Sequence, residues 1–400
     1  MVAALDSKSS PARGESSSLS SGTMKNLPLS YIELSKKNFI YNIKQFRRIL
    51  KRGTKVAGVI KANAYGHGDL EVTKILASFV DYFQVNSVEE LERVRMVTKK
   101  PILLLGYVAP NDISRAMRLG CILSVFDITH AKAIDMQAKK LKTRQKVHIA
   151  VDAHLGREGV LPSDVPQFLS EVKKLKTIVI DGVYAHFANI EDTTDFSHAK
   201  LQIDEYKNIV EQFKNAGYRK IKTHISATSG VLAYEKWNGY NPIVRIGIGL
   251  YGMWPSPELE RAWKKKIDLK PALRYLTHVA QVKTIPKGET IGYGLTYTTK
   301  KPTIIAVIPQ GYSNGLSRLS SNNGDVLIRG KRAPILGRVA MNMLVVDVSH
   351  IKGAKALDEV VILGTQKGET IPAEEIATKR GTINYELTTR LSPLLPRIVI

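Results

Sequence analysis

The chain has 400 residues, 44% hydrophobic and 24% charged, which is typical of a soluble globular protein. This length favours two domains, or one large barrel with an appendage, over a single small core. No apolar run approaches the roughly 20 residues that a membrane-spanning helix needs. The single cysteine, Cys121, excludes an intramolecular disulfide and a cysteine-based zinc site, and we assign no metal ligands. A reducing, cytoplasmic setting follows.

The formal charge of +23 could indicate a nucleic-acid or anionic-surface partner. The basic residues, however, are scattered over several helix-like segments, such as 44–55 and 139–146, without interleaved aromatic residues. They match no recognisable DNA- or RNA-binding module. Solvated helix faces or a generally basic proteome explain the charge better, so we expect neither a nucleic-acid nor a membrane partner.

Residues 1–28 are expected to form a disordered tail, because the first 23 are rich in Ser and poor in apolar residues. They lack the apolar centre of a secretory signal. Residues 29–34 could form a strand, which is a candidate to pair with the C-terminal domain. Apolar residues at helical spacing then predict a helix over 36–51.

From residue 55 a strand-then-helix pattern repeats eight times. Short β-branched runs lie at 56–60, 82–85, 102–105, 122–126, 147–151, 178–184, 221–225 and 243–248. Segments of helical character lie between them at 87–97, 111–119, 129–141, 163–174 and 196–215. Eight such units predict a parallel (β/α)8 barrel of the TIM type within residues 29–265. A doubly wound open sheet is the alternative, but it typically has five or six strands.

Lys61 directly follows the first barrel strand, in the run K-V-A-G-V-I-K-A-N-A-Y-G-H-G from Lys55 to Gly68. A lysine at the carboxyl end of a buried strand is partly desolvated, which lowers its pKa as an imine-forming amine requires. A surface lysine beside an ordinary polar turn would look the same. The rest of the chain must therefore decide between the two interpretations.

Other chemically active residues also follow barrel strands, and barrels carry their chemistry on the loops at these carboxyl ends. In chain order they are His154 and Arg157, His186, Ser226 and Thr228, and then Arg245, Gly247 and Ile248. A hydroxyl after strand seven and backbone N–H groups at strand eight could form a phosphate site. An imine-forming lysine and a phosphate site on one rim point to pyridoxal 5'-phosphate as the cofactor.

Residues 266–400 are predicted to form a mostly antiparallel β domain, because short alternating runs are separated by turns. These runs lie at 276–283, 303–309, 325–328, 333–335, 343–348 and 359–364, and helical period returns at 373–379 and 384–391. Tyr293, between two glycines in I-G-Y-G-L-T-Y, is a candidate catalytic phenol. Tyr312, in Q-G-Y-S-N-G, and the run Gly337–Met343 are further site candidates.

The sequence resembles the fold-type III pyridoxal phosphate enzymes, and within them the alanine racemase family, from about residue 29 to the C-terminus. V-I-K-A-N-A-Y-G-H-G is similar to the family's lysine signature almost letter for letter. V-R-I-G-I-G-L-Y-G, G-Y-G-L-T-Y and T-I-N-Y-E follow in the family's order. The resemblance implies a homodimer in which the partner's β domain completes each barrel site.

The resemblance also implies roles for individual residues. Lys61 would hold the cofactor as an imine and act as one base, and Tyr293 from the other subunit would act as the second base. Arg245 would contact the pyridine nitrogen, with His186 as its orienting neighbour. Arg157 would lie near the cofactor phenolate and the substrate carboxylate.

The phosphate group and the substrate would have further contacts by the same resemblance. The phosphate would be held by Tyr65, Thr228, Gly247, Ile248 and Tyr385. The backbone N–H of Met341 would contact the substrate carboxylate, with Tyr312 near the entrance.

The chain departs from the family's pattern at several positions. Ala150 stands where many members carry a lysine that becomes carbamylated and supports the arginine equivalent to Arg157. D-A-H-L-G-R replaces the usual D-T-G-M-G-R, G-Y-S-N-G replaces G-Y-A-D-G, and Ala340 and Asn342 flank Met341 where Cys and Asp are frequent. These changes leave the two bases in place and bear on substrate choice and on the position of Arg157.

We therefore expect racemisation of L- and D-alanine by two bases, supplying D-alanine for peptidoglycan. The alternatives are a broader racemase acting on serine or lysine, a decarboxylase of the same fold type, and a non-catalytic carrier of pyridoxal phosphate. The Tyr293 and Met341 motifs are racemase-like, which disfavours a decarboxylase. Such carriers resemble the barrel alone, which makes the second domain an argument against them.

Overall fold

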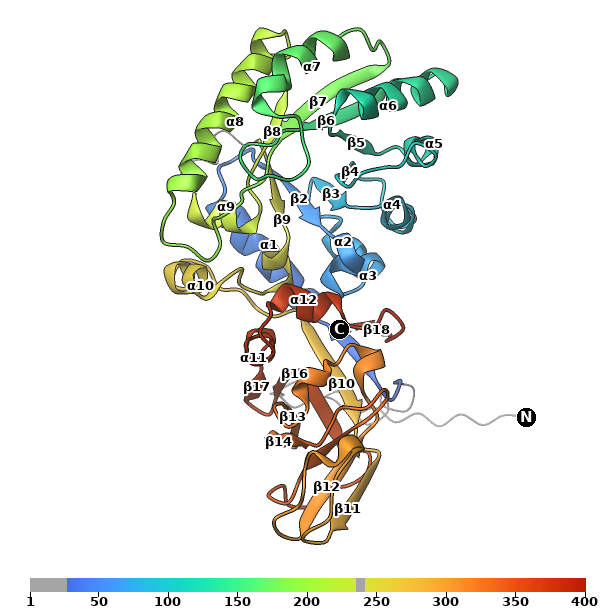
Figure 1. Cartoon of the computed structure of the whole chain (residues 1–400), viewed down its shortest axis with the longest axis vertical. Coiled ribbons are helices and arrows are strands. Elements are labelled where there is room, and N and C mark those ends of the chain that lie inside the picture. Colours follow the sequence, from blue (N-terminus) through green and yellow to red (C-terminus); the bar gives the residue numbers. More distant parts are fainter. Residues whose placement is uncertain (1–26, 235–241) are drawn as a thin grey trace, which may run out of the picture.

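The computed structural model describes residues 27–234 and 242–400, so the predicted tail lies, apart from its last two residues, outside the described residues. The molecule is elongated, with a strand barrel surrounded by helices at one end and a β domain at the other (Figure 1). Among the described residues, no helix combines the length and apolar character needed to cross a membrane.

The barrel is a parallel sheet of eight strands in the order β8-β7-β6-β5-β4-β3-β2-β9. Its strands are β2 (Lys55–Val59), β3 (Tyr82–Val85), β4 (Ile102–Leu104), β5 (Ile122–Val125), β6 (Gln145–Ala150), β7 (Ile178–Tyr184), β8 (Lys222–His224) and β9 (Ile243–Ile246). The two ends of the sheet meet where the Arg245 N–H donates to the Ser226 carbonyl at 3.0 Å. The sheet is thus a nearly closed barrel, which confirms the predicted (β/α)8 fold and excludes the open doubly wound sheet.

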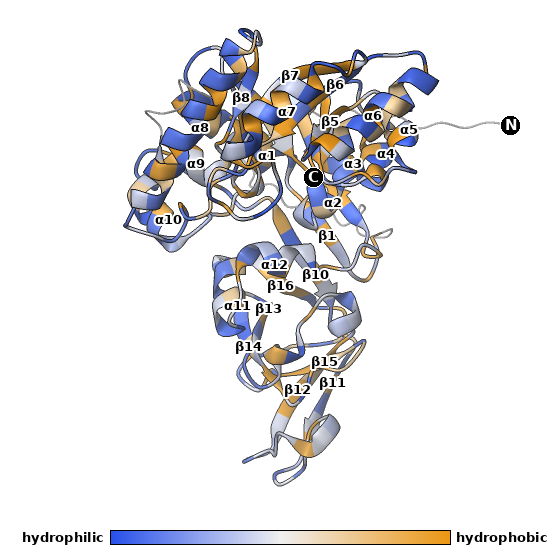
Figure 2. Ribbon diagram, turned by 45° about the horizontal axis from the view of Figure 1, so that its top comes forward, coloured by the Kyte–Doolittle hydropathy of each residue, from blue (hydrophilic) through white to orange (hydrophobic). Residues whose placement is uncertain are grey.

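Helices surround this barrel and cover its apolar strands (Figure 1). They are α1 (Lys36–Ile49), α3 (Asp69–Leu76), α4 (Val88–Arg95), α5 (Ile113–Arg118), α6 (Ile128–Lys140), α7 (Val165–Val172), α8 (Ser197–Asn215), α9 (Thr228–Ala233) and α10 (Pro257–Trp263). Figure 2 shows hydrophobic colour along the strands and hydrophilic colour on the outer turns of α7 and α8. Burying these apolar helix faces stabilises the barrel through the hydrophobic effect.

The second sheet has the order β11-β12-β15-β14-β13-β16-β10-β1-β18, with β17 paired to β16. Its strands are β1 (Tyr31–Leu34), β10 (Leu273–His278), β11 (Gln281–Ile285), β12 (Thr303–Ile308), β13 (Asp325–Ile328), β14 (Lys331–Leu336), β15 (Leu344–Asp347), β16 (Glu359–Gln366), β17 (Glu369–Ile371) and β18 (Arg397–Val399). Neighbouring strands are antiparallel except for β1 and β18, which confirms the predicted antiparallel domain. The N-terminal strand β1 pairs with β10, so it lies in the C-terminal sheet.

One predicted strand is wrong: the run 276–283 is two strands, because β10 ends at His278 and β11 begins at Gln281. The two strands have different partners, since β10 pairs with β1 and β16 whereas β11 pairs with β12. The alternation of apolar residues continues through the change of partner. A local pattern therefore could not reveal the break.

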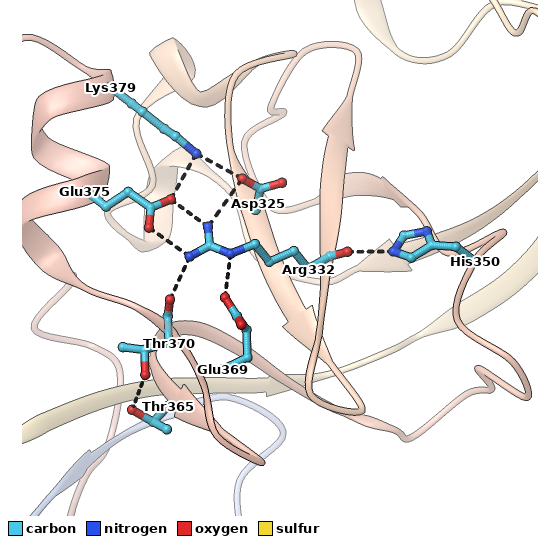
Figure 3. A network of polar contacts seen from close by, with 8 residues as sticks. All are labelled: Asp325, Arg332, His350, Thr365, Glu369, Thr370, Glu375 and Lys379. Carbon is cyan, nitrogen blue, oxygen red and sulfur yellow. Dashed lines mark hydrogen bonds and ion pairs between the residues drawn. The ribbon is translucent and has the colours of Figure 1, made fainter.

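A polar network attaches helix α11 (Ala373–Lys379) to the C-terminal sheet (Figure 3). Arg332 on β14 donates two hydrogen bonds to the Glu375 carboxylate, at 2.6 and 2.9 Å, and one to Glu369 at 2.7 Å. Lys379 pairs with Glu375 at 3.0 Å and with Asp325 at 2.9 Å. Hydrogen bonds from Arg332 lower the pKa of Glu375 to about 2. The network thus fixes α11, from which the chain continues into α12 (Asn384–Thr389) and back to the barrel.

Candidate active site

A cavity of about 210 Å³ opens at the carboxyl ends of the barrel strands. All nine residues predicted to bind the cofactor line it: Lys61, Tyr65, Arg157, His186, Thr228, Arg245, Gly247, Ile248 and Tyr385. The structure therefore brings together residues that are up to 324 positions apart in the chain (385 minus 61). Within the described part of the chain, no group of three or more His, Cys, Asp or Glu residues is placed to hold a metal ion.

Lys61 begins a short helical segment, α2 (Lys61–Tyr65), whose backbone is left-handed. Residues 62–65 have φ angles between 51° and 54°, although none of them is glycine. Such a conformation costs roughly 1–2 kcal/mol for each residue, so its neighbours must stabilise it. The Glu90 carboxylate accepts a hydrogen bond from the Ala62 N–H at 2.6 Å, and the Asn63 side chain accepts one from the Asp69 N–H at 3.0 Å.

The C-terminal domain also supports this left-handed turn. A Cβ atom on Gly66 would lie 1.8 Å from the Thr388 carbonyl oxygen, so α12 packs directly against the turn. The Arg397 guanidinium donates to the Gly66 carbonyl at 2.8 Å. His67 lies buried behind the turn, and its burial lowers its pKa to about 4. Both domains therefore determine where Lys61 lies.

The Lys61 amine is accessible through the open cavity, yet enough protein surrounds it to change its ionisation. Burial and the nearby positive charge of Arg157 both lower the pKa of Lys61. A lower pKa leaves a larger fraction of the amine unprotonated at neutral pH, which is the nucleophilic form. This agrees with a role in covalent attachment.

Arg245 on β9 is 4% exposed, and its guanidinium is held by several acceptors. One terminal nitrogen lies 2.5 Å from His224 Nδ1, and the other donates to the Ala185 carbonyl at 2.8 Å. The second nitrogen also lies 3.2 Å from His186 Nδ1. Burial lowers the pKa of Arg245 to about 10, so it stays charged at neutral pH. Burial and the Arg245 charge lower the pKa of His186 to about 3, so His186 is neutral.

One corner of the cavity gathers hydroxyl groups and backbone N–H groups. The Thr228 hydroxyl accepts a hydrogen bond from the Gly247 N–H at 3.1 Å, and a Cβ atom on Gly247 would lie 2.5 Å from the Tyr65 hydroxyl. Tyr385, carried by α12, points its hydroxyl at Glu191, 3.3 Å away. Hydroxyl and backbone donors at a position without a Cβ atom are suited to a phosphate group. The residues present therefore fit pyridoxal phosphate.

The loop that carries Arg157 is organised by Asp152, whose carboxylate accepts hydrogen bonds from the N–H groups of residues 155–157 at 2.8 to 3.1 Å. The Arg157 guanidinium pairs with the adjacent Glu158 carboxylate at 2.5 and 2.9 Å. Ala150 is buried in an apolar cluster with Leu105, Phe126 and Tyr184. Glu158 is therefore the partner of Arg157 in this chain.

The three remaining site candidates lie outside this cavity, on the C-terminal domain. Tyr293 is 74% exposed and Met341 is 55% exposed. Close backbone contacts join their loops. A Cβ atom on Gly337 would lie 2.4 Å from the Ile291 carbonyl oxygen, and a Cβ atom on Gly311 would lie 2.4 Å from the Met341 carbonyl oxygen. Tyr312 follows Gly311 and is also exposed. The loops that carry Tyr293, Tyr312 and Met341 thus contact one another on the C-terminal domain, and none of the three residues lines the cavity that contains Lys61 of the same chain.

Two family models match nearly the whole chain. The alanine racemase N-terminal domain matches residues 34–255, and the alanine racemase C-terminal domain matches residues 272–399. The chain belongs to the alanine racemase family. It is therefore an amino-acid racemase, an isomerase.

Curated alanine racemases are similar over almost their full length. Alanine racemase 2 of Caldanaerobacter subterraneus subsp. tengcongensis is 36% identical over 372 residues, covering 92% of this chain and 94% of the relative. The alanine racemase of Leptospira interrogans serovar copenhageni is 34% identical over 387 residues, covering 95% and 98%.

Solved alanine racemase structures have the same fold. The enzyme of Clostridium difficile 630 has a TM-score of 0.87 and 31% identity, covering 94% of this chain and 97% of that one. The Bacillus anthracis enzyme with bound L-Ala-P has a TM-score of 0.87 and 29% identity, covering 94% and 96%. These similarities support racemisation of alanine as the activity of this alanine racemase family member.

Several residues that line or support this cavity have no clear functional signal in the sequence. Glu191 lines the cavity, although its segment, N-I-E-D, has the pattern of an ordinary polar loop. Glu158, next to an arginine, has the pattern of a surface ion pair. His224 contacts Arg245 from β8, and the available signal for it is a histidine within a short strand-like run.

Proposed function

We propose that this chain binds pyridoxal 5'-phosphate through Lys61 and interconverts L- and D-alanine in a homodimer whose subunits share each active site. The convergence of nine residues on one cavity around Lys61 is the observation that carries this proposal. When bound, the cofactor withdraws electrons from the α-carbon of an attached amino acid and makes its proton acidic.

Racemisation needs a base on each face of the α-carbon, because one removes a proton while the other delivers one. The Lys61 amine serves one face from within the cavity. The Tyr293 phenol serves the other face from the partner subunit. This assignment is supported by the exposure of Tyr293 and by its absence from the cavity of its own chain. Met341 and Tyr312 share its surface and would reach the same cavity as substrate contacts.

Arg245 determines how strongly the cofactor ring can withdraw electrons. Its guanidinium can only donate hydrogen bonds and keeps its charge at neutral pH, so it would leave the pyridine nitrogen unprotonated. A moderate electron sink favours return of the proton to the α-carbon over side reactions. The neutral His186 restrains the guanidinium without adding a second charge.

Alanine is the favoured substrate, and supply of D-alanine for peptidoglycan is the favoured role. The relative crystallised with L-Ala-P supports a small substrate side chain. A broader racemase acting on serine or lysine is the second candidate, because the residues beside Met341 differ from the usual ones. The match of residues 272–399 to the C-terminal racemase domain disfavours a non-catalytic carrier.

The test is to load the purified protein with pyridoxal phosphate and incubate it separately with L-alanine, L-serine and L-lysine. Chiral chromatography then measures the D-enantiomer of each amino acid. D-alanine is expected to form fastest. Faster formation of D-serine or D-lysine would replace the substrate assignment, and no D-product from any of the three would overturn the proposed activity.

A further inference from the structure

A chain of hydrogen bonds leaves Arg245 on the side away from the cavity and crosses the barrel interior. Arg245 lies 2.5 Å from His224 Nδ1, and His224 Nε2 lies 2.7 Å from His148 Nδ1. His148 Nε2 then lies 3.2 Å from Asp181 Oδ2. Asp181 pairs with Lys222 at 2.8 Å near the opposite end of the barrel. Both histidines are 0% exposed, so the middle of this hydrogen-bond chain is shielded from water, whereas its Asp181 end is partly exposed.

The chemistry at the two ends allows one arrangement of protons along this chain. A guanidinium can only donate, so its contact with His224 Nδ1 favours the tautomer of His224 that carries the proton on Nε2. That Nε2–H donates to His148 Nδ1, which places the His148 proton on Nε2 as well. An ionised carboxylate can only accept, which matches Asp181 at the end of the chain. Burial lowers the pKa of both histidines, so both rings are neutral.

The backbone is adapted to this arrangement independently of the hydrogen bonds. The register between β6 and β7 shifts between Val147, which pairs with Ile180, and His148, which pairs with Gly182, so Asp181 has no partner residue on β6. A Cβ atom on Gly182 would lie 2.7 Å from Cε1 and Nε2 of His148, so the ring occupies space that only glycine leaves. The Tyr184 ring stacks on the His224 ring, with 5.0 Å between the ring centroids and an angle of 9° between the ring planes.

We propose that Asp181 is a positioning residue for Arg245, acting through His148 and His224. Its carboxylate holds both imidazoles in the Nε2–H tautomer, so that a lone pair of His224 faces the guanidinium. Without the carboxylate, His148 can adopt either tautomer, and an Nδ1–H on His224 would oppose an N–H of Arg245. The inference rests on the proposed function, which places Arg245 at the pyridine nitrogen.

The first test needs neither cofactor nor activity. Long-range proton–nitrogen NMR spectra of cofactor-free protein with ¹⁵N-labelled histidine distinguish the two tautomers of each ring. Signals of His148 and His224 are assigned by their loss in His148→Gln and His224→Gln. Both rings are expected to carry the proton on Nε2. A proton on Nδ1 of either ring in the unmodified protein would overturn the proposal, whatever the racemase assay shows.

The second test compares Asp181→Asn with Lys222→Gln. An amide can donate as well as accept, so Asp181→Asn no longer imposes one tautomer, and loss of the equivalent constraint is known to impair catalytic histidines. Lys222→Gln removes the same ion pair but keeps the carboxylate beside His148. Asp181→Asn is expected to produce mixed tautomers of His224 and to lower kcat by roughly tenfold, with KM changed by less than about twofold.

Lys222→Gln is expected to keep both tautomers and to keep kcat within about twofold. If the two variants lose thermal stability equally while tautomers and kcat stay unchanged in both, Asp181 has a structural role alone and the proposal is wrong. Should Asp181→Asn fail to fold, Gly182→Ala tests the same link, because its new methyl group displaces the His148 ring. Unchanged tautomers in that variant would contradict the proposal.

Discussion

The Tyr65 hydroxyl lies against the Cα atom of Gly247, where a Cβ atom would be 2.5 Å from the hydroxyl oxygen and 3.2 Å from Cζ. The Tyr65 ring cannot move away easily, because two other rings pack against it. Its centroid lies 4.8 Å from the Tyr251 ring centroid and 6.1 Å from the Tyr385 ring centroid. The absence of a side chain at Gly247 therefore permits the phenol and the backbone of β9 to share the phosphate corner.

Gly247→Ala is expected to displace Tyr65 and to raise the dissociation constant for pyridoxal phosphate by roughly tenfold or more, as loss of one or two good hydrogen bonds would. Absorbance titration of cofactor-free protein measures this constant. Gly58→Ala in β2 is a control, because its Cβ atom would come no closer than 3.2 Å to the Val80 side chain. Equal affinities in the two variants would show that Tyr65 does not contribute to phosphate binding.

Arg157→Met is expected to slow attachment of the cofactor below neutral pH. The Arg157 charge lowers the pKa of Lys61, so its removal raises that pKa and leaves less unprotonated amine at a given pH. The attachment rate is measured as the absorbance change on mixing with pyridoxal phosphate. In a plot of this rate against pH, the midpoint should lie at a higher pH for Arg157→Met than for the unmodified protein. Glu158 acts on Lys61 in the opposite direction, so Glu158→Gln should move the midpoint to lower pH. Midpoints that shift in the same direction would show that charge is not the cause.

Lys61→Ala and Tyr293→Phe are expected to be inactive or strongly impaired for different reasons. Lys61→Ala should lose the absorbance of the covalently bound cofactor, whereas Tyr293→Phe should keep it and slow α-proton exchange mainly in one stereochemical direction. Mixing the two proteins should restore part of the activity, because a hybrid dimer holds one site with both bases. Mixtures that stay inactive although hybrid dimers form would refute a shared site.

The protein is expected to lose stability as the pH falls below about 6.5, because buried neutral histidines resist protonation. Burial lowers the pKa of His67 to about 4 and that of His186 to about 3. Below pH 6.5 the unfolded chain binds protons that the folded chain does not, so stability present at neutral pH is lost between about 6.5 and 4.

The loss should amount to about 1.4 kcal/mol per pH unit for each such histidine. Thermal unfolding of cofactor-free protein from pH 8 to pH 4 measures it. His67→Gln should lower Tm at neutral pH and reduce its dependence on pH, because one of the titrating groups is removed. A Tm that is independent of pH over this range would contradict the assignment of neutral buried histidines.

The sequence determined much of this protein by itself. Hydrophobic patterns of period 2 and period 3.6 are local, and buried parallel strands are continuous apolar runs. The predicted bounds of all eight barrel strands therefore agree with the observed bounds within a few residues. The lysine run is equally local, since Lys61 and the glycines of its loop follow directly after β2. These features depend on neighbours in the chain, and a sequence displays such neighbours directly.

Only the tertiary structure decided which side chains face one another. The break between β10 and β11 depends on a change of strand partner, and the place of Glu158 and Glu191 in the cavity depends on how the loops after β6 and β7 come together. The chain from Arg245 to Asp181 joins residues from β9, β8, β6 and β7 across the barrel interior. Contacts between distant strands depend on register and on the register shift that leaves Asp181 unpaired, and a one-residue change in register would turn those side chains to the other face of the sheet.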